Sequence, residues 1–119
     1  MRIALDYDKT FTEHPAFWLA FASLAQLNGH EIRIVTIRDE RYDRTEPLTE
    51  LEEHLQVIWT RGVAKKWFCT HFADGWQPTI WIDDRPETIL HNSETTPEDL
   101  AAWRAERGED GTLAPVSDL

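Results

Sequence analysis

The stretch RIALDYDKT, residues 2–10, begins as a short apolar run and ends abruptly in charged residues. A run of this kind is typical of a buried strand in a parallel sheet. Three further segments resemble it: EIRIVT at 31–36, HLQVIWT at 54–60 and TIWID at 79–83. They are rich in β-branched and aromatic residues, which favour strands. We therefore predict four strands, the first over Arg2 to Tyr7.

Helical patterns lie between these predicted strands. Pro15 suits a first helical position, and apolar residues then recur at helical spacing until Asn28-Gly29 ends the run. After a polar loop at 38–46, Pro47 to Glu53 is expected to add a helical turn or two. A further helix is expected from about Val63. Its apolar face would carry Ala64, Trp67, Phe68, His71 and Phe72.

The alternation of strands and helices predicts an α/β fold. We expect a three-layer α/β/α Rossmann-like domain with a mostly parallel sheet over residues 1–107. Arg85-Pro86-Glu87 would open a short helix after the fourth strand, and Thr96 would cap a last helix that ends near Arg104. Residues 108–119 are expected to form a loose tail. In such folds ligands bind outside the carboxyl ends of the strands.

The composition narrows the classes of function. A chain of 119 residues with 41% apolar content can bury one core, and 22 acidic against 12 basic residues give a formal charge of -10. This charge disfavours nonspecific binding to nucleic acids. Cys69 is the only cysteine, so no intrachain disulfide forms, and no apolar run is long enough for a membrane. We expect a cytoplasmic protein without membrane contact.

Polar side chains follow several of the predicted strands. Asp6 and Asp8 follow the first, Thr36 ends the second, Lys65-Lys66 begins the helix after the third, and Asp83-Asp84 follows the fourth. Each has an ordinary interpretation when taken alone, because aspartates often cap turns and lysine pairs often lie on solvated helix faces. Their common location, at the edge where this fold binds its ligands, makes a functional site the better interpretation.

The segments DYDKT, IVT and WIDD, with the lysine after the third strand, resemble the four motifs of the haloacid dehalogenase (HAD) superfamily. The resemblance covers residues 3–84 and is greatest to short phosphatase-like members. It implies a magnesium-dependent phosphatase that hydrolyses a phosphate monoester through an aspartyl-phosphate. Asp6 would be the nucleophile, and Asp8 would protonate the leaving oxygen and then activate water.

The resemblance also implies how phosphate and metal are held. Thr36 and Lys65 would bind the phosphoryl oxygens. Asp83, Asp6 and the backbone carbonyl of Asp8 would ligate Mg²⁺, a cation that prefers oxygen ligands. Asp84 would either bind through water or orient its neighbour. Lys65 is chosen over Lys66 because it flanks the expected apolar face of its helix, whereas Lys66 falls nearly opposite.

The chain departs from the usual HAD pattern at two points. Lys9 stands where many members carry glycine, and its side chain would either crowd the turn or contact phosphate. The connections at 10–15 and 60–65 are too short for the cap domain that most members insert there. An open site would accept a large or exposed phosphate or be covered by a second copy of the chain. Lys9, Thr10 and Arg38 are candidates to contact substrate, although for Arg38 a solvated loop is the plainer interpretation.

Other classes of protein fit less well. A receiver-like signalling domain carries its phosphoacceptor at the third strand, and no aspartate ends the segment 54–60. Cys69 lacks the arginine that a cysteine-dependent phosphatase needs and is expected in the core. A HAD-like domain that binds phosphate without catalysis, or serves in phosphotransfer or regulation, stays open as the alternative.

Overall fold

The computed structural model describes residues 1–93 and has four parallel strands at its centre. The strands are β1 (Arg2–Leu5), β2 (Glu31–Thr36), β3 (Val57–Trp59) and β4 (Ile80–Ile82), and they lie side by side in the order β3-β2-β1-β4. In the register, Ile3 lies opposite Ile32 of β2 and Ile80 of β4. The predicted parallel sheet is confirmed. All four carboxyl ends therefore meet at one edge.

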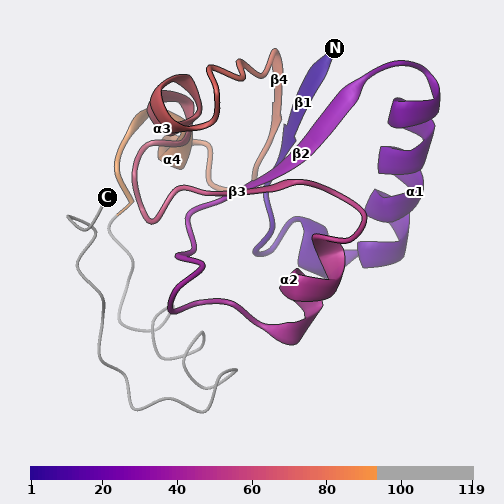
Figure 1. The fold of residues 1–119 in the computed structure, drawn as a ribbon, viewed down its shortest axis with the longest axis horizontal. Coiled ribbons are helices and arrows are strands. Elements are labelled where there is room, and N and C mark those ends of the chain that lie inside the picture. Colours follow the sequence, from indigo (N-terminus) through magenta and orange to yellow (C-terminus); the bar gives the residue numbers. More distant parts are fainter. Residues whose placement is uncertain (94–119) are drawn as a thin grey trace.

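Helices cover both faces of this sheet (Figure 1). They are a 3-10 turn at Phe11–Glu13, α1 (Pro15–Leu27), α2 (Glu46–Leu51), α3 (Lys65–Phe72) and α4 (Glu87–Leu90). In Figure 1, α1 lies to the right of the strands and α3 with α4 lies to the left. The expected three-layer α/β fold is thus observed. None of these helices is long and apolar enough to span a bilayer.

The alternating side chains of the strands build a separate core on each face. Strand residues pack with α1 and α2 on one face, in a cluster that includes Ile3, Leu5, Ile34, Ala22 and Leu48. On the other face the cluster contains Ala4, Val35, Ile58, Phe68, Cys69 and Trp76. The placement of Cys69 in a core is confirmed, because its side chain is buried and burial raises the pKa of its thiol to about 11.

The order of the strands decides where a ligand would lie. From β1 to β3 the chain moves steadily across the sheet, with α1 and α2 on one face; α3 then returns on the other face and places β4 beside β1. Right-handed connections require this change of face when the chain changes direction. The carboxyl ends of β1 and β4 flank this reversal, and in such sheets ligands bind outside the carboxyl ends of the strands at the reversal.

Several predicted boundaries move. The bounds of α1 and β2 are as predicted, whereas β1 ends at Leu5 and β4 ends at Ile82, one residue before Asp83. The strand expected from His54 begins only at Val57, because the N–H groups of His54 and Leu55 still bond to the carbonyl of Leu51 in α2. The helix expected from Thr96 to Arg104 and the tail at 108–119 lie outside the described residues.

The predicted apolar face of α3 is partly wrong. Trp67 and Phe72 are 49% and 54% exposed, while Lys65, Phe68 and Cys69 are the buried residues of this helix. Trp67 and Phe72 contact each other on the outside, with ring centroids 5.6 Å apart. The helical periodicity predicts this helix but not which of its sides faces the sheet. The side that is buried includes the charged residue Lys65.

The packing of α2 can be tested through Leu48, which is fully buried in the α1 and α2 core. Leu48→Ala should lower the free energy of unfolding by about 2–5 kcal/mol, because it leaves a cavity. Leu27→Ala is the matched control, since Leu27 is 84% exposed at the end of α1, and its effect should stay within about 0.5 kcal/mol. Urea denaturation measures both. Equal effects of the two substitutions would contradict this packing.

Candidate active site

Asp6 follows β1, next to the point where the strand order reverses, and is buried. Its N–H donates to the carbonyl of Ile82 at 2.9 Å, and its carbonyl accepts the N–H of Phe11 at 3.2 Å. The main chain of Asp6 is therefore tied both to the end of β4 and to the turn that follows β1. Tyr7 packs in the core on the α1 side, whereas the Asp6 carboxylate is contacted from α3.

Lys65 is the side chain of α3 that reaches the strand ends. Its ammonium donates to Asp6 Oδ1 at 2.9 Å and to Asp83 Oδ2 at 2.5 Å, and the residue is 1% exposed. Lys66, its neighbour, is exposed. A buried ammonium is tolerated only when it is paired, so these two carboxylates fix the position of Lys65 and hence the start of α3.

Thr10 holds the second oxygen of Asp6. Its hydroxyl donates to Asp6 Oδ2 at 3.1 Å and lies 3.4 Å from Asp84 Oδ1, so its one proton is shared between these acceptors. Asp83 is fixed independently, because its Oδ1 accepts the N–H of Arg85 at 2.9 Å. Both oxygens of Asp6 are thus engaged, one by a cation and one by a hydroxyl.

Asp6, Asp83 and Asp84 form a group of carboxylates that could hold a metal ion. Each offers an oxygen atom, and these oxygens lie within 4.8 Å of one another. When all are ionised, three negative charges face the single positive charge of Lys65, which leaves two in excess. Oxygen-only ligands and this excess fit a hard divalent cation such as Mg²⁺. The part expected of the Asp8 carbonyl stays a prediction.

The pKa of Asp6 depends on its burial and on the charges of the groups around it. Burial raises the pKa of Asp6, the Lys65 ammonium lowers it, and the carboxylates of Asp84 and Asp83 raise it, so that the resulting pKa is about 8. In the protein without metal, burial and the neighbouring carboxylates therefore favour the neutral form of Asp6. A metal ion bound by these carboxylates would add positive charge and favour the ionised form of Asp6.

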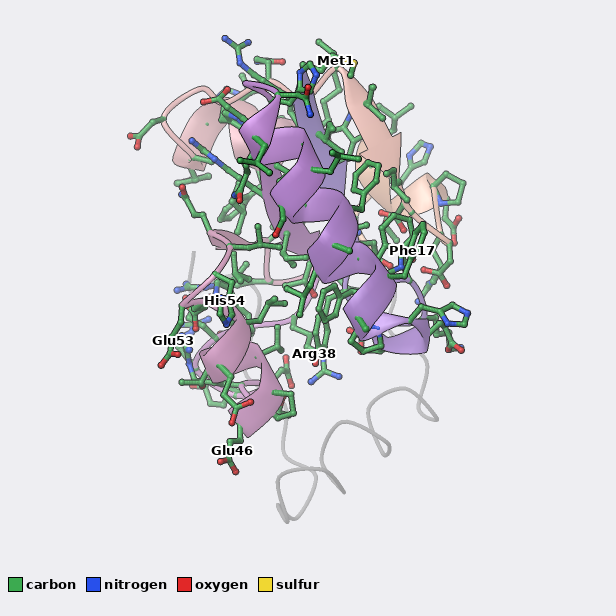
Figure 2. The ribbon with its side chains drawn as sticks, turned by 90° about the vertical axis from the view of Figure 1, so that its right-hand side faces the viewer. Met1, Phe17, Arg38, Glu46, Glu53 and His54 are labelled. Carbon is green, nitrogen blue, oxygen red and sulfur yellow. The ribbon has the colours of Figure 1, made fainter. Side chains whose placement is uncertain are left out.

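The side chain of Asp8 lies outside this carboxylate group and pairs with Arg38. Arg38 donates from Nε to Asp8 Oδ2 at 2.8 Å and from Nη2 to Asp8 Oδ1 at 2.7 Å. Arg38 is 2% exposed, so the interpretation of this residue as part of a solvated loop is wrong. In Figure 2, in which α1 faces the viewer, Arg38 lies between α2 and the lower end of α1, well below Met1.

The remaining candidates lie around this edge. Thr36 is fully buried at the end of β2, and its hydroxyl accepts the N–H of Arg38 at 3.2 Å. Lys9 is exposed and has a φ of 61°, the left-handed region that glycine favours, with its N–H donating to the Thr12 hydroxyl at 2.9 Å. The turn thus keeps a glycine-like backbone and directs the Lys9 side chain to solvent.

The sequence-based predictions do not include the pairing of Asp8 with Arg38, although the order of the residues along the chain allows it to be predicted. Asp8 follows β1 and Arg38 follows β2, and these strands are neighbours, so opposite charges beyond their ends can meet. The buried Asp43, whose Oδ2 accepts the N–H of Asp39 at 2.9 Å, had no such signal. It depends on the path of the loop after β2, which no periodicity predicts.

Comparison of the chain with family models, with curated proteins and with solved structures finds no match. The interpretation of the site therefore depends on its own geometry. That geometry joins a buried carboxylate, a buried ammonium and two further carboxylates at the carboxyl edge of a parallel sheet. Such a group can bind a divalent cation and an anionic substrate together.

The pKa of Asp6 predicts how stability depends on pH in metal-free protein. The unfolded chain loses this proton near the ordinary value of 3.8, whereas the folded protein keeps it until about pH 8. The folded state thus binds more protons between these values, and its stability falls as pH rises through this range. Asp6→Asn removes this contribution. Its stability relative to wild type should rise by at least about 1 kcal/mol from pH 5 to pH 8.

Urea denaturation of both proteins in EDTA at the two pH values makes the measurement. Titration of the groups that do not interact with Asp6 cancels in the difference between the proteins. Asp74→Asn is the control, because Asp74 is exposed in a turn beyond α3. A relative stability of Asp6→Asn that does not change with pH would contradict the raised pKa.

Proposed function

We propose that this protein is a magnesium-dependent phosphohydrolase of the HAD type, which hydrolyses a phosphate ester through an aspartyl-phosphate on Asp6. The observation that carries the proposal is the buried Lys65 ammonium, which bridges Asp6 and Asp83 at the carboxyl ends of β1 and β4. The contact joins the first, third and fourth of the motifs on which the resemblance depends. It supports the resemblance through geometry that the motifs alone do not contain.

Asp6 has the setting that a carboxylate nucleophile needs. Lys65 and Thr10 orient its two oxygens, and its main chain is bonded on both sides. An orientation fixed before the reaction lowers the barrier to attack on phosphorus. Asp6 must be ionised when it attacks an anionic substrate, so positive charge must lie beside both groups.

The charged groups around Asp6 meet this requirement. Lys65 would offset charge on the phosphoryl oxygens, and Thr36, at the end of the neighbouring strand β2, would donate a hydrogen bond to them. A divalent cation held by Asp6, Asp83 and Asp84 would add positive charge at the same oxygens. Asp8 would serve the hydrolysis of the acyl-phosphate as the base that activates water.

The connections in the chain keep this site open. The segment between β1 and α1 holds only a short loop and the 3-10 turn at Phe11–Glu13, and β3 leads to α3 through residues 60–64. Within residues 1–93 no additional domain is inserted at either place. We therefore propose a capless site, which would accept a phosphate group carried on the exposed part of a larger molecule.

The adjacent lysines of α3 provide the test, because they are the same type of residue but Lys65 is buried and Lys66 is exposed. Wild type should hydrolyse p-nitrophenyl phosphate with magnesium and lose this activity in EDTA. Lys65→Ala should lower kcat/KM by about 10²-fold or more, as the loss of an electrostatic stabiliser does. Lys66→Ala should stay within about twofold of wild type, because Lys66 is exposed. Asp6→Asn should abolish turnover.

Circular dichroism of each variant checks that the loss of activity is not a loss of fold. A Lys66→Ala enzyme as impaired as Lys65→Ala would show that α3 does not present Lys65 to the substrate. Asp6→Asn with wild-type turnover would exclude the covalent route. Magnesium and phosphate binding without turnover of any phosphate ester would favour the non-catalytic alternative.

A further inference from the structure

The outer surface of α1 is apolar and uncharged. The sequence of this helix, PAFWLAFASLAQL, contains no charged residue, although 29% of the whole chain is charged. Phe17, Leu24 and Leu27 are 60%, 61% and 84% exposed, and Ala20 is exposed as well. These four residues are called the α1 stripe. The exposed face of a helix normally carries its charged and polar residues, so the α1 stripe has the composition of a surface that another protein surface covers.

The α1 stripe follows one side of the helix. Its residues are spaced by three, four and three positions, so their side chains lie within about 80° of one another around the helix axis. This is the spacing of the contact between paired helices. The apolar surface continues onto β4, where Ile80 pairs with the core residue Ile3 and is 36% exposed. Figure 2 shows Phe17 on the same side of α1 as β4.

Two other occupants fit this surface less well. A helix that lies on a membrane surface uses Lys or Arg to contact anionic lipids, and α1 has neither, in a chain with a formal charge of -10. The described part of the chain ends at Ser93, whose N–H donates to the carbonyl of Gly62 at 2.7 Å, shortly before α3. Because α3 and α1 pack on opposite faces of the sheet, the described chain ends on the face away from the α1 stripe.

A second copy of the chain fits the α1 stripe by charge. Two copies with a formal charge of -10 each repel one another, and the repulsion is weakest where neither surface carries charged groups. The outer face of α1 is such a surface on both copies at once. A two-fold axis brings the same surface of each copy together, and an apolar stripe is complementary to itself.

The exposed area fits a weak dimer. The three large side chains of the α1 stripe expose roughly 350 Å² if each whole side chain has about 170 Å². With Ala20, Ile80 and the adjoining helix surface, two copies would bury about 1,000 Å² in total, the lower bound for a specific interface. A Kd on the order of 10 µM is then expected. Urea denaturation at about 1 µM chain therefore measures the single chain, as the Leu27→Ala control requires.

We infer that the protein forms a two-fold symmetric dimer in which the α1 helices of two copies pack against each other in antiparallel orientation. This inference does not depend on the proposed function. In the antiparallel pair, Phe17 lies opposite Leu27 of the partner subunit, and Ala20 lies opposite Leu24 of the partner subunit. The two large apolar side chains at the ends of the stripe then contact each other, and each Leu24 is placed over a small residue.

The charges of the molecule favour the antiparallel over the parallel orientation. The helix starts at the carboxyl edge of the sheet, shortly after β1, and ends at the opposite edge, shortly before β2. In a parallel pair, the acidic groups at the carboxyl edges of both copies would therefore lie side by side. The antiparallel pair separates them, and it also places the oppositely charged ends of the two helix dipoles together.

Sedimentation equilibrium of the full chain at about 1 µM and about 300 µM tests the dimer. Wild type should have the monomer mass of 13.9 kDa at the low concentration and approach twice that mass at the high one. Leu24→Lys should raise the Kd by about 10²-fold or more, because each dimer would bury two unpaired ammonium groups. Leu24 is exposed in the single chain, so the circular dichroism spectrum of the variant should match that of wild type.

Phe72→Lys is the matched control, because Phe72 is 54% exposed on α3 at the other face of the sheet. It replaces a large exposed apolar side chain by the same charge and should change the Kd by no more than about twofold. A wild-type chain that is monomeric at about 300 µM would overturn the inference. A dimer that Phe72→Lys dissociates and Leu24→Lys does not would overturn it too, because its interface would lie on α3.

Cysteine substitutions test the orientation. Phe17→Cys and Leu27→Cys each place one thiol near one end of the α1 stripe, and wild type is the control because its Cys69 is buried. Under mild oxidation, a mixture of the two variants should form disulfide-linked dimers between unlike chains faster than between like chains, because only unlike positions come close enough to bond. Mass spectrometry distinguishes the products. Faster cross-linking of Leu27→Cys with itself would overturn the antiparallel orientation.

Discussion

The buried ammonium of Lys65 is the contact on which the candidate site depends. It joins the first residue of α3 to carboxylates that follow β1 and β4, so one cation links the two strands between which the order of the sheet reverses. Without it, the Asp6 and Asp83 carboxylates, whose side chains are largely removed from solvent, would repel each other. The same two contacts of Lys65 therefore position α3 and hold the two carboxylates close together.

A second buried cation lies at the same edge of the sheet, beyond β2. Arg38 joins the end of β2 to Asp8, and through Asp43 it also binds the loop that follows β2. The acidic residues of the DYDKT segment are thus divided between two cations that come from different elements. Asp6 faces the lysine and the candidate metal ligands, and Asp8 faces the arginine. Asp6 and Asp8 therefore have different surroundings, and such a difference allows two carboxylates in one site to have different chemical roles.

The sequence predicts those parts of the molecule that follow from local pattern. The apolar runs located the strands, and the end of α1 at Leu27 followed from Asn28-Gly29. The rotation of α3 could not be predicted from periodicity, because Trp67 and Phe72 favour burial by type and only the tertiary contact of Lys65 decides otherwise. The Arg38 pair escaped prediction for a related reason. A charged residue in a polar loop is expected in water unless its buried partner is known.

The most direct test of the central claim is detection of a phosphorylated Asp6. Protein is mixed with magnesium and acetyl phosphate, quenched in acid within the first turnovers, and digested for peptide mass spectrometry. The account predicts one phosphorylated peptide, with the group on Asp6 and released by hydroxylamine as an acyl-phosphate should be. Steady hydrolysis of acetyl phosphate with no phosphorylated peptide, or with the phosphate on another residue, would contradict it.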